Sequence, residues 1–305
     1  KIPTFGIATN GMHSYVQGAG EALRQIAVRF CPSGEELWGM AGEGAHDVLH
    51  GAPAGSRGTR LRVNLLGATP LDFSLTGNVA GMKAFLASHG METLSCWAME
   101  SSLDEMRLAG LADVNLVVSA AGIPPAMELE RKYGTPYVVG TPVGRRAALR
   151  LAGLLRLGAG TGKSQSLFAG GNGHRDPSGG PWGGPVDLGL TGLPEDLSGE
   201  HILIVGEQVI AGSLRCSLRE DLGAGDIHVL CPTEGGADLA EPGDILVWDE
   251  DEAIAAMEKS TVVIADPLYR QVCPGDGRQV FVDFPHEACS GRMYHDRMKP
   301  FVCGV

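Results

Sequence analysis

Apolar runs that alternate with amphipathic segments constrain the fold of this chain more than any other feature of its sequence. The stretch at 112–140 shows one repeat: an apolar run at 114–119 ends in small residues, a charged segment at 124–134 follows, and a second apolar run begins at 135. Short continuous apolar runs are typical of strands buried on both faces, and amphipathic segments between them are typical of crossover helices. Repeats of this kind predict a doubly wound parallel sheet.

The same alternation continues along most of the chain. We expect helices to end at Gly90 and Gly223, because glycine favours the position after the last helical residue. Ser102 and Glu105 have the spacing of a capping box at a helix start. Strands are expected at 2–9, 60–67, 91–98, 114–119, 135–140, 201–207, 226–232, 243–249, 261–267 and 279–285, and helices at 19–30, 75–90, 102–112, 124–134, 145–160, 209–223 and 251–259. The sequence therefore predicts an α/β protein with two Rossmann-like, doubly wound parallel-sheet domains around a cleft.

A stretch dense in glycine and proline at 170–192 marks the boundary between the two predicted sheets. We expect a Rossmann-like domain at 59–160, a linker at 161–198 and a C-terminal Rossmann-like domain at 199–305. Residues 1–58 are expected to be the remnant that closes a preceding domain, together with a linker. The chain starts directly on an apolar run without an initiator methionine, so we expect further sequence upstream.

Composition excludes several classes of partner. The net charge of −12 disfavours a nucleic-acid partner, which needs clustered lysine and arginine. No apolar run approaches the ~18 residues of a membrane span. Seven cysteines are scattered without a CxxC pair, a pattern typical of reduced thiols rather than of a disulfide framework or a zinc knuckle. We therefore expect a cytoplasmic protein with no nucleic-acid and no membrane partner.

Two glycine-rich segments resemble nucleotide-binding motifs but lack residues that those motifs need. The segment GAGTGKS at 158–164 follows a helix, and Leu157 stands where a phosphate loop requires glycine. The segment GEQVIAG at 206–212 lacks the middle glycine that lets a pyrophosphate approach the backbone. The sequence thus predicts neither an NAD site nor another nucleotide site.

Candidate ligand residues lie in loops after expected strands. His286, Cys289 and His295 follow the last expected strand, and His13 follows the first. Imidazole and thiolate groups are common ligands of transition metals, so Cys289 and His295 are predicted metal ligands. Their spacing matches no standard zinc pattern, so an incidental grouping stays open, and His13 alone is also compatible with a structural role.

The order of four segments resembles one family, the component 1 type nitrogenase superfamily, which includes dinitrogenase subunits, their cofactor-assembly scaffolds and the dark-operative protochlorophyllide and chlorophyllide reductases. Residues 2–23 resemble the strand, loop and helix that close the family's first domain. Residues 63–119 resemble its second domain, and residues 127–144 resemble its acidic helix with the following Tyr-Gly and x-Pro pairs. Residues 284–304 resemble its last strand and the loop after it.

This resemblance implies three Rossmann-like domains per subunit, of which two lie in this sequence. It implies a homologous sister subunit or a homo-oligomer, and a reductase component that hydrolyses ATP and passes electrons through an iron–sulfur cluster. It also implies an iron–sulfur cluster in the complex. The family's bridging cysteines lie mostly in its first domain, so the ligands of such a cluster are expected outside this sequence or on a partner.

The resemblance also implies where a cofactor or substrate would lie. In dinitrogenase a cofactor-ligating cysteine follows the strand that corresponds to 114–119, and here Ser119 and Ala120 stand there. A hydroxyl is a poor iron ligand, so a molybdenum–iron cofactor is not expected, and the small residues would leave room for a bulky ligand. The family's cofactor histidine aligns near Met293, and the neighbouring residues that could substitute for it are His286 or His295. We predict cofactor contacts at Ser119, Ala120, His13 and His286.

The predicted function is that of a nitrogenase-like component 1 subunit, an oxidoreductase component. It would take part in reductase-driven electron transfer to a substrate or in metallocluster and cofactor assembly. Two alternatives stay open: a non-catalytic, two-lobed protein that binds a small ligand, and a degenerate subunit retained only to pair with an active sister. The sequence identifies no catalytic residue and no substrate.

Overall fold

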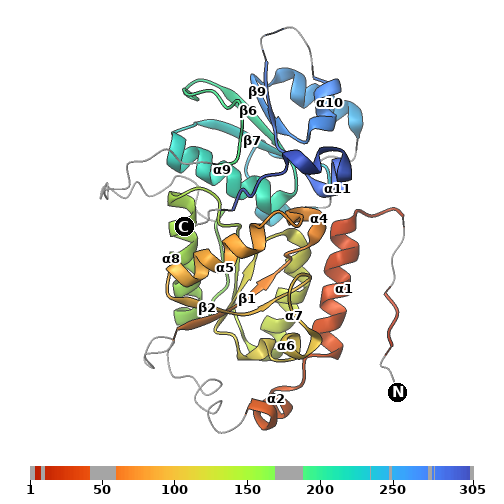
Figure 1. Cartoon of the computed structure of the whole chain (residues 1–305), viewed down its shortest axis with the longest axis vertical. Helices are drawn as coiled ribbons and strands as arrows, with labels where there is room; N and C mark the ends of the chain where they lie inside the picture. The colour runs from red at the N-terminus through yellow and green to blue at the C-terminus, as the bar shows by residue number, and fades with distance from the viewer. Residues whose placement is uncertain are drawn as a thin grey trace.

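The computed structural model describes residues 4–7, 11–41, 60–168, 188–233, 235–246, 249–273, 277 and 279–302. These residues form two five-stranded sheets in which every strand pair is parallel. The two sheets and their helices form two domains that lie one above the other (Figure 1). The predicted fold class of two doubly wound parallel-sheet domains is therefore confirmed.

The first sheet has the strand order β2-β1-β3-β4-β5. Its strands are β1 (Leu61–Leu66), β2 (Met91–Cys96), β3 (Val114–Val117), β4 (Tyr137–Val139) and β5 (Gln165–Ser166). Its helices are α1 (Tyr15–Arg29), α2 (Gly34–Ala41), α4 (Pro70–Phe73), α5 (Asn78–Ser88), α6 (Leu103–Arg107), α7 (Ile123–Tyr133) and α8 (Arg146–Thr161), with short 3-10 helices η2 (Ala109–Leu111) and η3 (Ala120–Gly122). Helices α5 and α8 pack on one face of this sheet, and α1 and α7 pack on the other.

The second sheet has the strand order β10-β9-β6-β7-β8. Its strands are β6 (His201–Val205), β7 (Asp226–Cys231), β8 (Ile245–Leu246), β9 (Val262–Ala265) and β10 (Val280–Asp283). Its helices are α9 (Gln208–Leu222), α10 (Glu250–Lys259) and α11 (Glu287–Ser290), with 3-10 helices η4 (Ala237–Leu239), η5 (Pro267–Gln271) and η6 (Gly291–Arg297). Alternate residues of each strand face opposite layers, so Ile202 and Ile204 pack against α9 while Leu203 and Val205 pack against α10.

Strand order reverses once in each sheet, and the reversal points indicate where a site is expected. In the first sheet the chain turns in opposite directions after β1 and β3, and in the second after β6 and β9. Open α/β sheets bind ligands outside the carboxyl ends of the strands at such a reversal. In this chain the two reversal points face each other across the junction between the domains, because Ala120 after β3 contacts Glu207 after β6.

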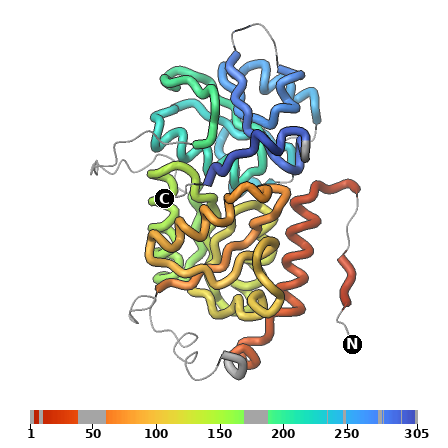
Figure 2. The backbone as a smooth tube through the Cα atoms, in the orientation of Figure 1, coloured from red at the N-terminus to blue at the C-terminus, as the bar shows by residue number. Residues whose placement is uncertain are grey.

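The two domains contact each other through helices and through the end of the chain. Helix α8 packs against α9, and Arg150 Nη2 lies 2.6 Å from Glu220 Oε1. The C-terminal stretch returns from the second domain along the junction (Figure 2). There the Phe301 ring stacks on Phe73, and the backbone N–H of Phe301 donates to Asn78 Oδ1 over 3.0 Å. The junction is therefore fixed on two sides.

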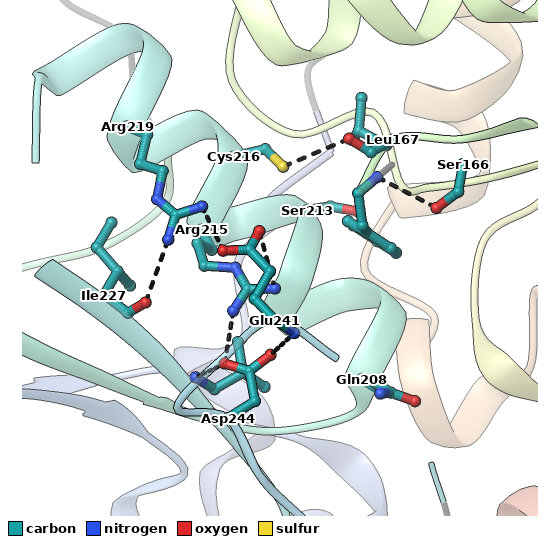
Figure 3. A network of polar contacts seen from close by, with 12 residues as sticks. Ser166, Leu167, Gln208, Ser213, Arg215, Cys216, Arg219, Ile227, Glu241 and Asp244 are labelled. Carbon is teal, nitrogen blue, oxygen red and sulfur yellow. Dashed lines mark hydrogen bonds and ion pairs between the residues drawn. The ribbon is translucent and has the colours of Figure 1, made fainter. Parts of the chain in front are cut away.

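A buried ionic network fixes α9 to the loop between β7 and β8 (Figure 3). The Arg215 guanidinium is 1% exposed and donates from Nη1 to Asp244 Oδ1 over 2.6 Å. Glu241 Oε1 lies 3.2 Å from Arg215 Nη2, and Arg219 Nη1 donates to Glu241 Oε2 over 2.6 Å. Buried arginine needs such paired carboxylates, because an uncompensated buried charge is costly.

Some expectations from the sequence differ from the structure. A strand was expected at 2–9, but residues 4–7 have no regular structure, and the rest of this segment lies outside the described residues. Strand β5 lies inside the segment expected as a linker. Residues 169–187 of that segment lie outside the described part of the chain. The limits of the domains stay a prediction. Among the described residues, no helix is long and apolar enough to cross a membrane.

Candidate functional site

A small cavity lies where the two reversal points face each other. Its volume is about 20 Å³, and a cavity of ~10–15 Å³ on this scale is enough for one water molecule. Both domains contribute to its wall, since Tyr15 comes from α1 and the other lining residues come from the second domain. It is lined by Tyr15, Val205, Gly206, Glu207, Pro232, Thr233, Asp266, Tyr269, Phe284, His286 and Cys289.

Asp72 organises the side of the cavity that belongs to the first domain. It lies on α4, whose N-terminus is capped by the Thr69 hydroxyl, and it is 4% exposed. Thr69 Oγ1 donates to Asp72 Oδ2 over 2.7 Å, and the Tyr15 hydroxyl donates to Asp72 Oδ1 over 2.5 Å. His286 Nε2 lies 3.5 Å from the same Oδ1 without making a hydrogen bond. Asp72 therefore links α1, α4 and the loop after β10.

Glu207 organises the opposite side of the cavity. It follows β6 directly, caps α9 and is buried. Its carboxylate accepts hydrogen bonds from the backbone N–H groups of Ile210 and Val209 at the start of α9, and from Ala120 N over 2.8 Å across the domain junction. Burial, followed by repulsion from the Asp72 carboxylate, raises the pKa of Glu207 to about 7 against the pull of these N–H groups.

Asp266 fixes the loop that carries His286. It follows β9, and its Oδ2 accepts from His286 N over 2.8 Å and from Ser290 Oγ over 2.7 Å. His286 in turn caps α11, because its Nδ1 accepts from Ala288 N over 3.3 Å. With Nδ1 used as an acceptor, the ring proton is directed from Nε2 toward Asp72 and the cavity. The ring orientation is thus set by contacts on both of its nitrogens.

The electrostatics of the cavity keep several groups protonated near neutral pH. Burial works to lower the pKa of His286, whereas the facing Asp72 and Cys289 act to raise it, and the ring keeps the Nε2 proton that faces Asp72 while Nδ1 accepts from Ala288 N. Burial and the Asp72 carboxylate raise the pKa of Tyr15 well above its usual range. Burial and Cys289 raise the pKa of Tyr269 to about 12. Three proton donors therefore surround the cavity, together with Glu207, which can both donate and accept a proton near pH 7.

A family comparison identifies the chain. The family model described as nitrogenase component 1 type oxidoreductase matches residues 2–166, which is more than half of the chain. The chain belongs to the nitrogenase component 1 type oxidoreductases. A light-independent protochlorophyllide reductase subunit of Chlorobium phaeovibrioides (strain DSM 265 / 1930) is 26% identical over 243 residues, which cover 69% of this chain and 41% of that protein. The chain therefore spans about two-fifths of the length of this curated relative.

A solved structure supports the same fold. The structure described as nitrogenase Cp1 at pH 6.5 matches this component 1 chain with a TM-score of 0.56 and 14% sequence identity. The match covers 95% of this chain and 62% of the nitrogenase chain. Together with the family match, it confirms the resemblance that the order of segments indicated.

The structure shows which contacts Ser119 and Ala120 make, two of the residues that we predicted to contact a cofactor. Ser119 is fully buried, and its hydroxyl donates to Gly67 O over 2.7 Å. Ala120 uses its N–H for Glu207. The strand ends beside them are closely packed: a Cβ at Gly67 would lie 2.7 Å from Gly122 N, and one at Gly122 would overlap the carbonyl of Leu66. Contacts of Ser119 and Ala120 with a cofactor stay predictions.

The predicted histidine and cysteine ligands separate into different places. His286 and Cys289 line the cavity. His13 is exposed, and His295 is about half exposed, with Nδ1 3.4 Å from Glu287 Oε2. Within the described ranges, Cys289 and His295 belong to no set of three or more metal-ligand side chains; the set that exists is His201, Asp226 and His228. A metal site at Cys289 and His295 therefore rests on the sequence alone.

Members of the component 1 family hold metalloclusters, and iron–sulfur clusters need several thiolates. The described residues do not fit such a cluster within this chain, since they bring no three cysteines together. Burial raises the pKa of the Cys31, Cys216 and Cys231 thiols to about 11, which disfavours the thiolate form that binds iron. The prediction that cluster ligands lie outside this sequence or on a partner is compatible with these contacts.

Sequence reasoning missed Asp72, Glu207 and Tyr15. Glu207 could have been noticed because it follows a buried strand directly. A carboxylate in that position indicates the edge of a binding site, as well as a cap for the next helix. Asp72 follows Thr69 by three residues, which indicates a capped helix and no more. Tyr15 carried no signal of its own, because its partner Asp72 is 57 residues away in the chain.

The raised pKa of Glu207 predicts a pH-dependent stability. The folded chain holds this proton up to about pH 7, whereas an unfolded chain releases it near pH ~4.3. The Glu207 proton therefore stabilises the folded chain fully below the unfolded pKa. This contribution to the free energy of unfolding, on the order of 3 kcal/mol in total, is lost as pH rises through about 7. Glu207→Gln should remove this part of the decline when free energies of unfolding in urea are compared at pH 5 and pH 8. Glu92→Gln, on the exposed face of β2, should leave the decline as it is, and an equal decline in all three proteins would contradict the assignment.

Proposed function

We propose that this chain is part of a nitrogenase-like component 1 subunit that takes part in the reductase-driven reduction of an organic substrate, and that its interdomain cavity delivers protons for that reaction. The observation that carries the proposal is the cluster of protonated groups around a cavity of about 20 Å³, at the two facing strand-end reversal points. Membership of the family and the similarity to a protochlorophyllide reductase subunit support an oxidoreductase role.

Reduction of a carbon–carbon double bond consumes two electrons and two protons. The electrons would come from an ATP-hydrolysing iron–sulfur reductase component, and a homologous sister subunit or a second copy of the chain would complete the complex. The protons must come from groups that keep them near pH 7 and exchange them again. Glu207, with its pKa of about 7, fits the exchanging position. Tyr15 and His286 fit the positions of donors that stay protonated.

The size of the cavity argues for proton transfer rather than for binding of the substrate. A space for about one water molecule is far below the ~300–1,000 Å³ of a ligand pocket. Cys289 of α11 lines the cavity and is itself exposed, and we propose that the cavity reaches the surface there. The substrate would therefore bind outside this opening. A role in metallocluster assembly is less well supported, because the described residues bring no three thiolates together.

The test uses the full chain, copurified anaerobically with its reductase component and sister subunit. The assay follows the ATP-dependent reduction of protochlorophyllide, with electron delivery recorded separately as ATP hydrolysis per reductase. Glu207→Gln should lower turnover by about 10²–10⁴-fold with unchanged ATP hydrolysis and an unchanged KM. The control Glu92→Gln should keep the activity of the unmodified protein.

Three outcomes would overturn the proposal. Full turnover in Glu207→Gln would exclude the proton-delivery role. A complex that assembles and hydrolyses ATP but reduces no substrate through this subunit would favour a degenerate partner subunit. A chain that binds no reductase, but is stabilised by small metabolites in a thermal-shift screen, would favour the two-lobed ligand-binding protein.

A further inference from the structure

Three metal-ligand side chains meet at the edge of the second sheet opposite the cavity, where β6 and β7 begin. His201 Nδ1 lies 2.7 Å from Asp226 Oδ2, and His228 Nε2 lies 2.9 Å from Asp226 Oδ1. One ligand atom from each residue lies within 4.8 Å of the other two. We infer that His201, Asp226 and His228 form a binding site for a divalent transition-metal ion of the zinc type.

The backbone of the sheet brings the three side chains together. His201 is paired directly with Asp226 in the parallel register of β6 and β7. His228 follows Asp226 by two residues in the same strand, so both side chains point to the same face of the sheet. Paired strands lie ~4.8 Å apart, so the His201 and Asp226 side chains start from neighbouring backbone positions on the same face. The grouping is therefore a consequence of strand register and not of flexible loops.

The His228 ring is held from behind by a fixed loop. A Cβ at Gly243 would lie 2.5 Å from His228 Cε1 and 2.6 Å from Nδ1, so the ring packs directly on this glycine. The loop is fixed by Asp244 and Glu241, which bind Arg215 and Arg219 in the network of Figure 3. Asp244 Oδ1 also accepts from Val229 N, next to His228. A ligand whose ring is held in this way loses little freedom when it binds an ion.

The chemistry of the three groups suits a borderline metal ion. Two imidazoles and one carboxylate are common zinc ligands, at ~2.0–2.2 Å from the ion, with water in the remaining positions. The ion would take the place of the protons that now lie between each imidazole and Asp226, so each neutral ring would carry its proton on the other nitrogen. His201, Asp226 and His228 are all solvent-accessible, which gives the ion a route in. The bound ion would join the first residues of two neighbouring strands.

The test is a calorimetric titration of the full chain with zinc chloride, repeated with cobalt chloride and read by visible absorption. Asp226→Asn and His228→Ala should each remove one equivalent of bound zinc or weaken that equivalent by at least tenfold. His89→Ala, which changes a partly exposed histidine of the first domain, should bind as the unmodified chain does. Zinc should raise the melting temperature of the unmodified chain and not that of His228→Ala.

Gly243→Ala provides a second variant that keeps all three ligands. Its added methyl group would displace the His228 ring, so it should weaken the same equivalent and change the cobalt spectrum. Circular dichroism confirms that each variant is folded before titration. Isotherms that are the same in the unmodified chain, Asp226→Asn and His228→Ala would overturn the inference, as would the absence of zinc binding to the unmodified chain.

Discussion

Replacement of Asp72 by alanine is expected to lower the free energy of unfolding by about 2–4 kcal/mol, because buried donors lose the carboxylate that they face. Asp72 is buried and accepts hydrogen bonds from Tyr15 and Thr69, and it faces the ring of His286. Its removal leaves the buried Tyr15 hydroxyl without its acceptor and the His286 Nε2–H without the carboxylate that it faces, and unpaired buried donors are costly. Urea unfolding followed by circular dichroism at pH 7 measures the effect.

The control for this variant is Asp104→Ala. The Asp104 side chain is 93% exposed, and its Oδ1 lies 3.9 Å from Arg107 Nη1. Exposed ion pairs of this kind contribute about 0–1 kcal/mol to the free energy of unfolding. A second measurement links the loss to the cavity: Asp72→Asn should lower the pKa of His286, as followed by the NMR shifts of its ring protons. If Asp72→Ala unfolds at the same urea concentration as Asp104→Ala, Asp72 does not hold the junction together.

Gly122→Ala is expected to destabilise the fold by more than about 3 kcal/mol or to prevent folding. A Cβ at Gly122 would overlap the carbonyl group of Leu66, and backbone atoms have no rotamer through which to move away. The carboxyl ends of β1 and β3 can approach this closely only because Gly67, with a φ of +86°, and Gly122 carry no side chain. Soluble yield and urea unfolding measure the loss.

Gly153→Ala is the matched control, and its expected effect has the opposite sign. Gly153 lies on the exposed side of α8, and no atom lies within 4 Å of its added Cβ. Alanine is a better helix former than glycine, so this variant should gain about 0.5–1 kcal/mol. Equal stability of Gly122→Ala and Gly153→Ala would show that the strand ends are loosely packed.

Much of the architecture could be predicted from local patterns. Buried strands such as β3 and β9 appear as continuous apolar runs, because both of their faces are covered by helices. Helix ends at Gly90 and Gly223 were signalled by glycine, and both residues have a positive φ. Strand β5 was missed because it has two residues, which pair with β4 and leave too short a pattern to detect.

The candidate site was less predictable, because its residues come from distant parts of the chain. His286 was predicted from its residue type and its place after a strand, and it does line the cavity. Its partners Asp72 and Tyr15 lie on α4 and α1, and only the packing of the two domains brings them to His286. Ser119 was predicted from the family resemblance, and its hydroxyl is used to join two strand ends. Sequence position thus identified the correct edge of each sheet, but not which side chains meet there.

The return of the C-terminal stretch to the first domain limits how the two lobes can move. Val302 pairs with Val143 in an antiparallel bridge, and Asn78 accepts from the backbone of both Phe301 and Val302. A hinge motion that separates the two domains would have to break the bridge between Val302 and Val143 and unstack Phe301 from Phe73. We therefore expect the two domains to move as one body.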